Sequence, residues 1–118
     1  MAEPQFTFDI SADHGEISKR YTFGFWVGSG KFSVVMAGRD KITKEDVAIK
    51  CILKDPEDKN QRFTVMREVQ IMRKICKHPN VVKFYHFSES DRYYFMVMEL
   101  IRGEEMFECI RRVRYSCY

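Results

Sequence analysis

The hydrophobic positions of the chain follow a strand-like pattern for most of its length and a helical pattern in two places. Runs rich in β-branched and aromatic residues, bounded by glycine or polar turns, predict strands. Five such runs occur, over residues 21–27, 32–37, 47–53, 81–87 and 93–100. The connections between the first three, and between the last two, are short enough for hairpins, which favours an antiparallel sheet.

A helix is predicted between the third and fourth strands. Its apolar residues recur at the spacing of one buried helical face, at Val65, Val69, Met72 and Cys76. Asp55 is a suitable N-cap, Pro56 suits the first helical position, and Pro79 ends the pattern. A second helical pattern, with Met106, Phe107, Ile110 and Val113, follows Gly103. The sequence therefore predicts an α+β fold, with one helix covering a five-stranded antiparallel sheet and a terminal helix after it.

The composition favours one folded domain without a nucleic-acid or membrane role. The 118 residues are 45% hydrophobic, and the net charge is only +3. No apolar run could span a bilayer, and the N-terminus does not resemble a secretory leader. The four cysteines and three histidines have no metal-ligand spacing, so we predict no metal site. We expect an intracellular, cytoplasmic protein whose residues 1–18 form a mostly flexible leader, although the alternating residues 6–10 could add a short edge strand or a docking segment.

Glycines at the tip of the first hairpin allow backbone N–H groups to approach phosphate oxygens. Gly28 and Gly30 are located at this tip, but an ordinary hairpin turn would explain the two glycines equally well. A P-loop is excluded, because its first glycine would fall at Phe25 and Phe32 follows the lysine where Ser or Thr is required. A dinucleotide-binding turn is excluded because its third glycine position is Ser33 and no helix follows.

The same segment resembles the glycine-rich loop of the eukaryotic protein kinase family. Residues 27–35 read V-G-S-G-K-F-S-V-V, against the kinase pattern G-x-G-x-x-G-x-V. Phe32 at the tip and Val35 after it fit that pattern. Ser33 replaces the third glycine, a replacement that resembles the calcium/calmodulin-dependent kinase group of Ser/Thr kinases.

A lysine and a glutamate extend the resemblance. Residues 47–50 read V-A-I-K, and strand alternation places Ala48 and Lys50 on one face. Taken alone, Lys50 would be a solvated surface lysine. The resemblance implies that it contacts ATP phosphates and pairs with Glu68 on the following helix, where Glu57 is the less suitable alternative. The H-P-N step at 78–80 is also kinase-like.

The end of the fifth strand resembles a kinase hinge. The resemblance implies that Met98 is the gatekeeper, that the backbone of Glu99 and Ile101 binds adenine, and that Glu105 lies near the ribose or a basic substrate residue. Glu104 replaces the second glycine of the family's G-G-E-x-F pattern. The implied ATP-binding set is Val27, Gly28, Ser29, Gly30, Lys31, Phe32, Ser33, Val34, Val35, Ala48, Lys50, Met98, Glu99, Ile101 and Glu105.

The parts of a kinase that perform phosphoryl transfer do not occur in these 118 residues. H-R-D, D-F-G and A-P-E are all absent, so the catalytic aspartate and the Mg²⁺ ligands are missing. The resemblance thus divides the chain into a leader (1–18), a kinase small lobe with its hinge (19–102) and the start of a truncated large lobe (103–118). We expect a fragment or truncated product that is inactive and self-associating by itself. The parent would use ATP and Mg²⁺, phosphorylate a protein substrate and contain the large lobe.

A non-catalytic interaction module built on a kinase lobe is the alternative. The sequence does not identify a substrate or an activating signal. The basic run at Arg111, Arg112 and Arg114 is typical of a solvated helix face, and we assign it no function.

Overall fold

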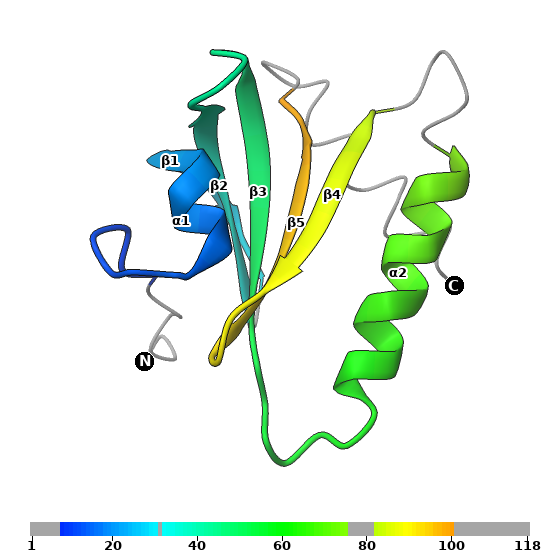
Figure 1. The fold of residues 1–118 in the computed structure, drawn as a ribbon. Coiled ribbons are helices and arrows are strands. Elements are labelled where there is room, and N and C mark those ends of the chain that lie inside the picture. Colours follow the sequence, from blue (N-terminus) through cyan, green and yellow to red (C-terminus); the bar gives the residue numbers. More distant parts are fainter. Residues whose placement is uncertain (1–7, 31, 76–81, 101–118) are drawn as a thin grey trace.

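A computed structural model of the chain describes residues 8–30, 32–75 and 82–100. Two helices and five strands are present in these ranges, arranged as in Figure 1. In chain order they are α1 (Glu16–Arg20), β1 (Tyr21–Ser29), β2 (Ser33–Asp40), β3 (Asp46–Leu53), α2 (Gln61–Ile75), β4 (Phe84–Glu89) and β5 (Tyr93–Glu99).

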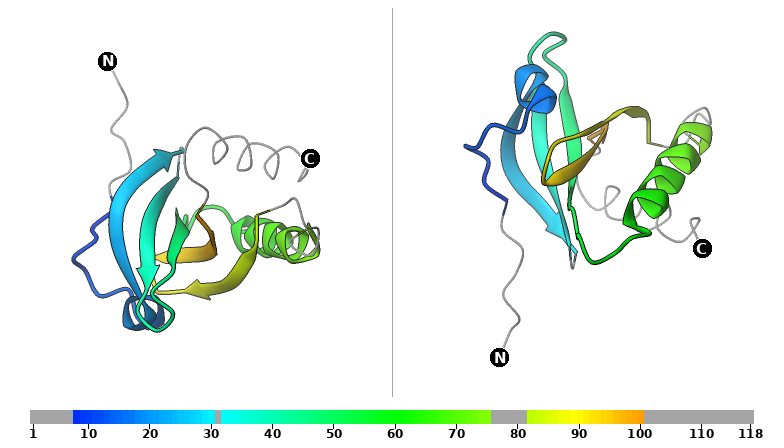
Figure 2. Two further views of the ribbon diagram at one scale, coloured as in Figure 1. Left: turned by 90° about the horizontal axis from the view of Figure 1, so that it is seen from above. Right: turned by 60° about the horizontal axis from the view of Figure 1, so that its bottom comes forward.

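The five strands form one antiparallel sheet in the order β1-β2-β3-β5-β4. The sheet curls strongly, and α2 lies along one side of it while α1 lies at the other (Figure 2). The predicted fold class, an α+β fold with a five-stranded antiparallel sheet and a covering helix, is confirmed. Strand β4 begins at Phe84 and not at residue 81 as the apolar pattern suggested.

The two faces of β3 belong to two separate cores, as strand alternation requires. Ala48 and Ile52 are buried with the apolar face of α2. Ile49 and Cys51, both fully buried, point to the opposite face and pack with Ile17 of α1. The sheet therefore needs an apolar cover on both sides.

The segment before β1 supplies the second cover, where the sequence analysis expected a flexible leader. Ile17 is only 1% exposed. The His14 ring is buried and stacks on Phe8 with ring centroids 4.5 Å apart, and both rings contact Phe95 edge-on. His14 Nε2 also lies 2.7 Å from the backbone oxygen of Asp9. The residues that make these contacts are too widely spaced to produce a helical or strand-like period, which explains why the pattern missed them.

Helix α2 starts five residues later than predicted. Asp55, the predicted N-cap, instead closes a turn by accepting a hydrogen bond from the backbone N–H of Glu57, and Asp58 closes the next turn by accepting one from the N–H of Asn60. The Gln61 side chain then bonds to the backbone at both Leu53 and Asp55, which fixes the entry into the helix. The predicted helix end near Pro79 and the predicted helix over 103–118 lie outside the described residues.

Candidate functional site

Lys50 of β3 and Glu68 of α2 form an ion pair. Lys50 Nζ lies 2.8 Å from Glu68 Oε1, and the two side chains are 23% and 21% exposed. The sequence predicted this pair, and the structure brings the two residues together across a separation of 18 positions.

The folds of both elements put these two side chains opposite each other. Lys50 lies between Ala48 and Ile52 on the face of β3 that meets α2. Glu68 adjoins Val69 on α2, where Val65, Val69 and Met72 form the apolar stripe that packs on the sheet. Because both charged groups retain partial access to water, the pair contributes less than about 1 kcal/mol to stability. Its main effect is to hold the ammonium group in one position.

The glycine-rich segment forms the tip of the hairpin that β1 and β2 make. Gly28 pairs with Val35, and Ser29 pairs with Val34, so β1 continues through two residues that the sequence placed in the tip. The backbone N–H of Gly30 donates to the oxygen of Ser33 over 2.7 Å.

The tip itself is tight. A Cβ atom at Gly30 would lie 3.0 Å from Ser33 Oγ, so a side chain there would force the serine to move. Phe32 is 46% exposed, and its backbone oxygen accepts a hydrogen bond from Leu53 N–H, which ties the tip to the end of β3. Lys31 lies outside the described residues.

Apolar core residues lie beside Lys50 on the α2 face of the sheet. Val35, Ala48 and Met98 belong to the core on the α2 face, and Val27 packs against it. Ala48 pairs directly with Met98 in the sheet, and Val35 pairs with Lys50. Small and flexible apolar side chains therefore lie next to the ammonium group.

Four residues of the predicted ATP-binding set are buried in the other core, bonded to Lys83 or outside the described residues. The Val34 side chain is buried in the other core, so it does not face the Lys50 side of the sheet. Glu99 ends β5, donates its N–H to the Lys83 oxygen over 2.8 Å, and accepts the Lys83 N–H at its carboxylate. Ile101 and Glu105 lie outside the described residues.

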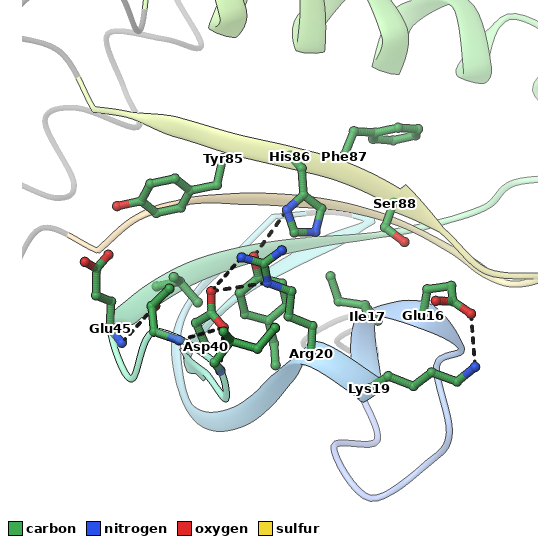
Figure 3. A pocket seen from close by; sticks show the side chains of 14 residues that line it. Glu16, Ile17, Lys19, Arg20, Asp40, Glu45, Tyr85, His86, Phe87 and Ser88 are labelled. Atoms are coloured by element: carbon green, nitrogen blue, oxygen red, sulfur yellow. Dashed lines mark hydrogen bonds and ion pairs between the residues drawn. The ribbon is translucent and has the colours of Figure 1, made fainter.

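A cavity of about 790 Å³, which no sequence pattern indicated, lies between α1, the β2–β3 turn and β4 (Figure 3). Neither Lys50 nor Glu68 lines it. Its wall comes from three segments that are distant in the chain, and no local spacing rule links them. Asp40, at this cavity, is 4% exposed and accepts two hydrogen bonds from the Arg20 guanidinium.

The model of the protein kinase domain family matches residues 21–117. The chain belongs to the protein kinase domain family. The match covers every strand of the sheet and α2, and it begins at the first residue of β1. The resemblance found in the glycine-rich loop and in the V-A-I-K strand is thereby confirmed.

Several curated relatives are Ser/Thr protein kinases. A probable myosin light chain kinase of Dictyostelium discoideum is 42% identical over 97 residues, which are 80% of this chain and 24% of that protein. The calcium/calmodulin-dependent protein kinase type II of Schizosaccharomyces pombe is 43% identical over 75% of this chain and 18% of its own length. The Ser/Thr kinase srk1 of the same yeast is 36% identical over 82% and 18%. The chain thus spans about a quarter or less of these relatives.

No helix in residues 8–30, 32–75 and 82–100 is long and apolar enough to cross a membrane. Within those same ranges, no three histidine, cysteine, aspartate or glutamate side chains are grouped so that they could hold a metal ion.

Proposed function

We propose that this chain is the ATP-binding portion of a Ser/Thr protein kinase, which transfers the γ-phosphate of ATP to protein hydroxyl groups. The observation that carries the proposal is the Lys50–Glu68 ion pair, 2.8 Å long and partly accessible to water. A lysine on this strand, oriented by a glutamate on the next helix, is how kinases present a positive charge to the α- and β-phosphates. Membership in the kinase domain family supports the same conclusion.

The surrounding residues suit the other parts of ATP. Val27, Val35, Ala48 and Met98 offer an apolar surface for the adenine ring. The backbone at Gly28 to Ser33 would lie over the phosphates. In this proposal the backbone of Glu99 and Ile101 binds the adenine edge, and Glu105 lies near the ribose or a basic substrate residue.

Phosphoryl transfer needs groups that these 118 residues do not contain. Mg²⁺ bridges the phosphates in kinases, but the sequence has neither the D-F-G aspartate nor the catalytic-loop asparagine that hold it. We therefore propose that these residues bind nucleotide weakly and transfer no phosphoryl group by themselves. Residues 103–118 would begin the large lobe, which completes the site, and a protein substrate would be the phosphoryl acceptor, in the cytoplasm.

Nucleotide titration of the chain tests the proposal. ATP binding, measured by displacement of a fluorescent ATP analogue, should weaken at least about tenfold in Lys50→Met, because the phosphate contact is lost. Lys74→Met is the matched control, since Lys74 is an exposed lysine on α2 and lies outside the ion pair. Equal nucleotide affinity in the two variants would contradict the proposal.

The alternative function is a non-catalytic module that binds partners of a kinase. Such a module would retain its partner binding in Lys50→Met. If Lys50→Met lost partner binding together with nucleotide binding, the result would instead favour the first function, ATP binding as part of a kinase.

A further inference from the structure

The cavity on the side of β4 opposite α2 has a rigid floor. The hydroxyl of Tyr21 and Nδ1 of His86 are 3.2 Å apart, which connects the start of β1 to β4. Arg20 Nη2 and Nε lie 3.0 and 3.2 Å from Asp40 Oδ2. The other carboxylate oxygen of Asp40 accepts the N–H of Ile42 over 2.9 Å. The cavity is therefore built before any ligand arrives.

The charges that line the cavity are paired, with one exception. Lys19 pairs with Glu16, and Arg20 pairs with Asp40. The fifth lining charge is Glu45, whose carboxylate has no ion pair among the residues that the structure describes. An anion would have to displace an existing pair, whereas a cation would meet a free carboxylate.

An aromatic ring lies at the same end of the cavity as this carboxylate. Tyr85 and Glu45 are neighbours there in Figure 3, and Tyr85 is 40% exposed. Burial, and then the negative charges of Glu45 and Glu99, raise the pKa of the Tyr85 phenol. The two carboxylates therefore make the electrostatic potential at this ring more negative. An ammonium or guanidinium group is attracted both to the face of such a ring and to the adjacent carboxylate.

The cavity also follows an open edge of the sheet. Strand β4 is last in the strand order, and among the described residues only β5 pairs with it. Four consecutive residues of β4, 85–88, line the cavity. Successive residues of a strand point to opposite faces, so a cavity that meets all four runs along the strand edge. Unpaired N–H and C=O groups on such an edge can accept an additional extended strand.

We propose that this cavity is a docking site for an extended peptide segment that carries a lysine or arginine, with the peptide backbone along β4 and the cation between the Tyr85 ring and the Glu45 carboxylate. The lining carries three carboxylates against one lysine and one arginine, which disfavours acidic ligands, and the strand edge favours a peptide over a small free amine. The site shares no residue with Lys50 and Glu68, and its occupation does not depend on nucleotide.

A defined peptide pair tests the proposal on the full 118-residue chain. The probe is acetyl-Thr-Val-Arg-Val-Thr-amide, and its partner contains the neutral isostere citrulline in place of arginine. Titrations are followed by the amide NMR shifts of the ¹⁵N-labelled chain. We expect shifts confined to α1, residues 40–45 and β4, and at least about tenfold weaker binding of the citrulline peptide, because it lacks the charge.

Variants at the two ligand-facing residues sharpen the test. Glu45→Gln and Tyr85→Leu should each weaken the arginine peptide at least about fivefold. Glu57→Gln removes an exposed carboxylate far from the cavity lining and should leave affinity unchanged. The urea midpoint of each variant establishes that it is folded. Lys50→Met should also bind the peptide normally, so failure of the nucleotide site is distinguishable from failure of this one.

Four results would overturn the proposal. The first is amide NMR shifts at residues outside the cavity, and the second is equal affinity for the arginine and citrulline peptides. The third is an equal loss of peptide affinity in Glu45→Gln and Glu57→Gln. The fourth is saturable binding of spermidine at Glu45 with no binding of the peptide. The last result would assign the site to a small polyamine.

Discussion

The hydroxyl of Tyr21 and the imidazole Nδ1 of His86, 65 residues apart in the chain, lie within 3.2 Å of each other. They come from β1 and β4, the two edge strands of the curled sheet, so this side-chain contact links its two ends without pairing the strands. Tyr21 is buried and His86 is half-buried. Burial lowers the pKa of His86, and the nearby positive charge of Arg20 lowers it further.

Acidification should therefore destabilise the chain through His86. The pKa of His86 is lower in the folded chain than its ordinary value of 6.5, so the unfolded chain takes up the proton first as the pH falls. The stabilisation that neutral His86 contributes is fully present above pH 6.5. It is lost as the pH falls from 6.5 through the lower pKa of His86 in the folded chain. Urea unfolding at pH 7.5, 6.5 and 5.5 should show a smaller free energy of unfolding at the acidic end.

The variant His86→Gln isolates this effect from the other histidines. It should flatten the decrease in unfolding free energy between pH 7.5 and 5.5, whereas His14 and His78 are unchanged in it. A decrease of the same size in the wild type and in the variant would contradict the assignment to His86.

Asp40 should control stability at lower pH. Hydrogen bonds from Arg20, with further ones from the N–H groups of Ile42 and Thr43, lower the pKa of Asp40 to about 2. Because this pKa lies below the ordinary value of 3.8, the stabilisation from Asp40 is present above that value and is lost as the pH falls toward 2.

Asp40→Asn should remove this dependence, since an amide does not titrate. We expect a lower melting temperature than the wild type at pH 6 and a smaller further decrease between pH 4 and 2.5, measured by circular dichroism. Asp91→Asn is the control, because Asp91 is an exposed residue of the turn between β4 and β5. If Asp40→Asn and the wild type lose stability in parallel below pH 4, the Arg20–Asp40 pair is not the cause.

The variant Glu68→Gln should weaken nucleotide binding while leaving the stability of the fold nearly unchanged. The substitution removes the charge 2.8 Å from Lys50 but keeps the shape of the side chain. We expect the free energy of unfolding to change by less than about 1 kcal/mol, because both side chains are partly hydrated. Nucleotide affinity should decrease several-fold, about 3- to 10-fold, since the lysine loses its fixed position. Gln70→Ala, on the exposed side of α2, provides the matched control.

The strands were predictable because their signals are local, whereas the ion pair was predicted from the resemblance to protein kinases. The alternation in β3 alone assigns Ala48 and Lys50 to one face and Ile49 to the other, and the structure has this arrangement. Helical spacing likewise identified Val65, Val69 and Met72 as the buried stripe of α2. The two periods identify the faces of β3 and α2 that meet, but the choice of Glu68 as the partner of Lys50 came from the kinase resemblance.

The sequence did not predict the late start of α2 or the cover formed by the segment before β1. The first depends on a side chain that suits either of two local structures, and the second depends on tertiary contacts. Asp55 suits either a helix cap or a turn, and the Gln61 hydrogen bonds to Leu53 and Asp55 favour the turn. The cover formed by Phe8 and His14 depends on aromatic rings of β5, which follow some 80 residues later. No window of the sequence contains both partners.

Ile17→Ala tests whether the segment before β1 is an integral part of the fold. Ile17 is 1% exposed and packs in the core that includes Tyr21 and Ile49, so its truncation leaves a cavity. We expect the free energy of unfolding to fall by about 2 kcal/mol or more, measured by urea denaturation. Ile42→Ala provides a control of the same chemistry, because Ile42 is 73% exposed, and it should change stability by less than about 0.5 kcal/mol. Equal effects of the two substitutions would mean that α1 does not stabilise the sheet.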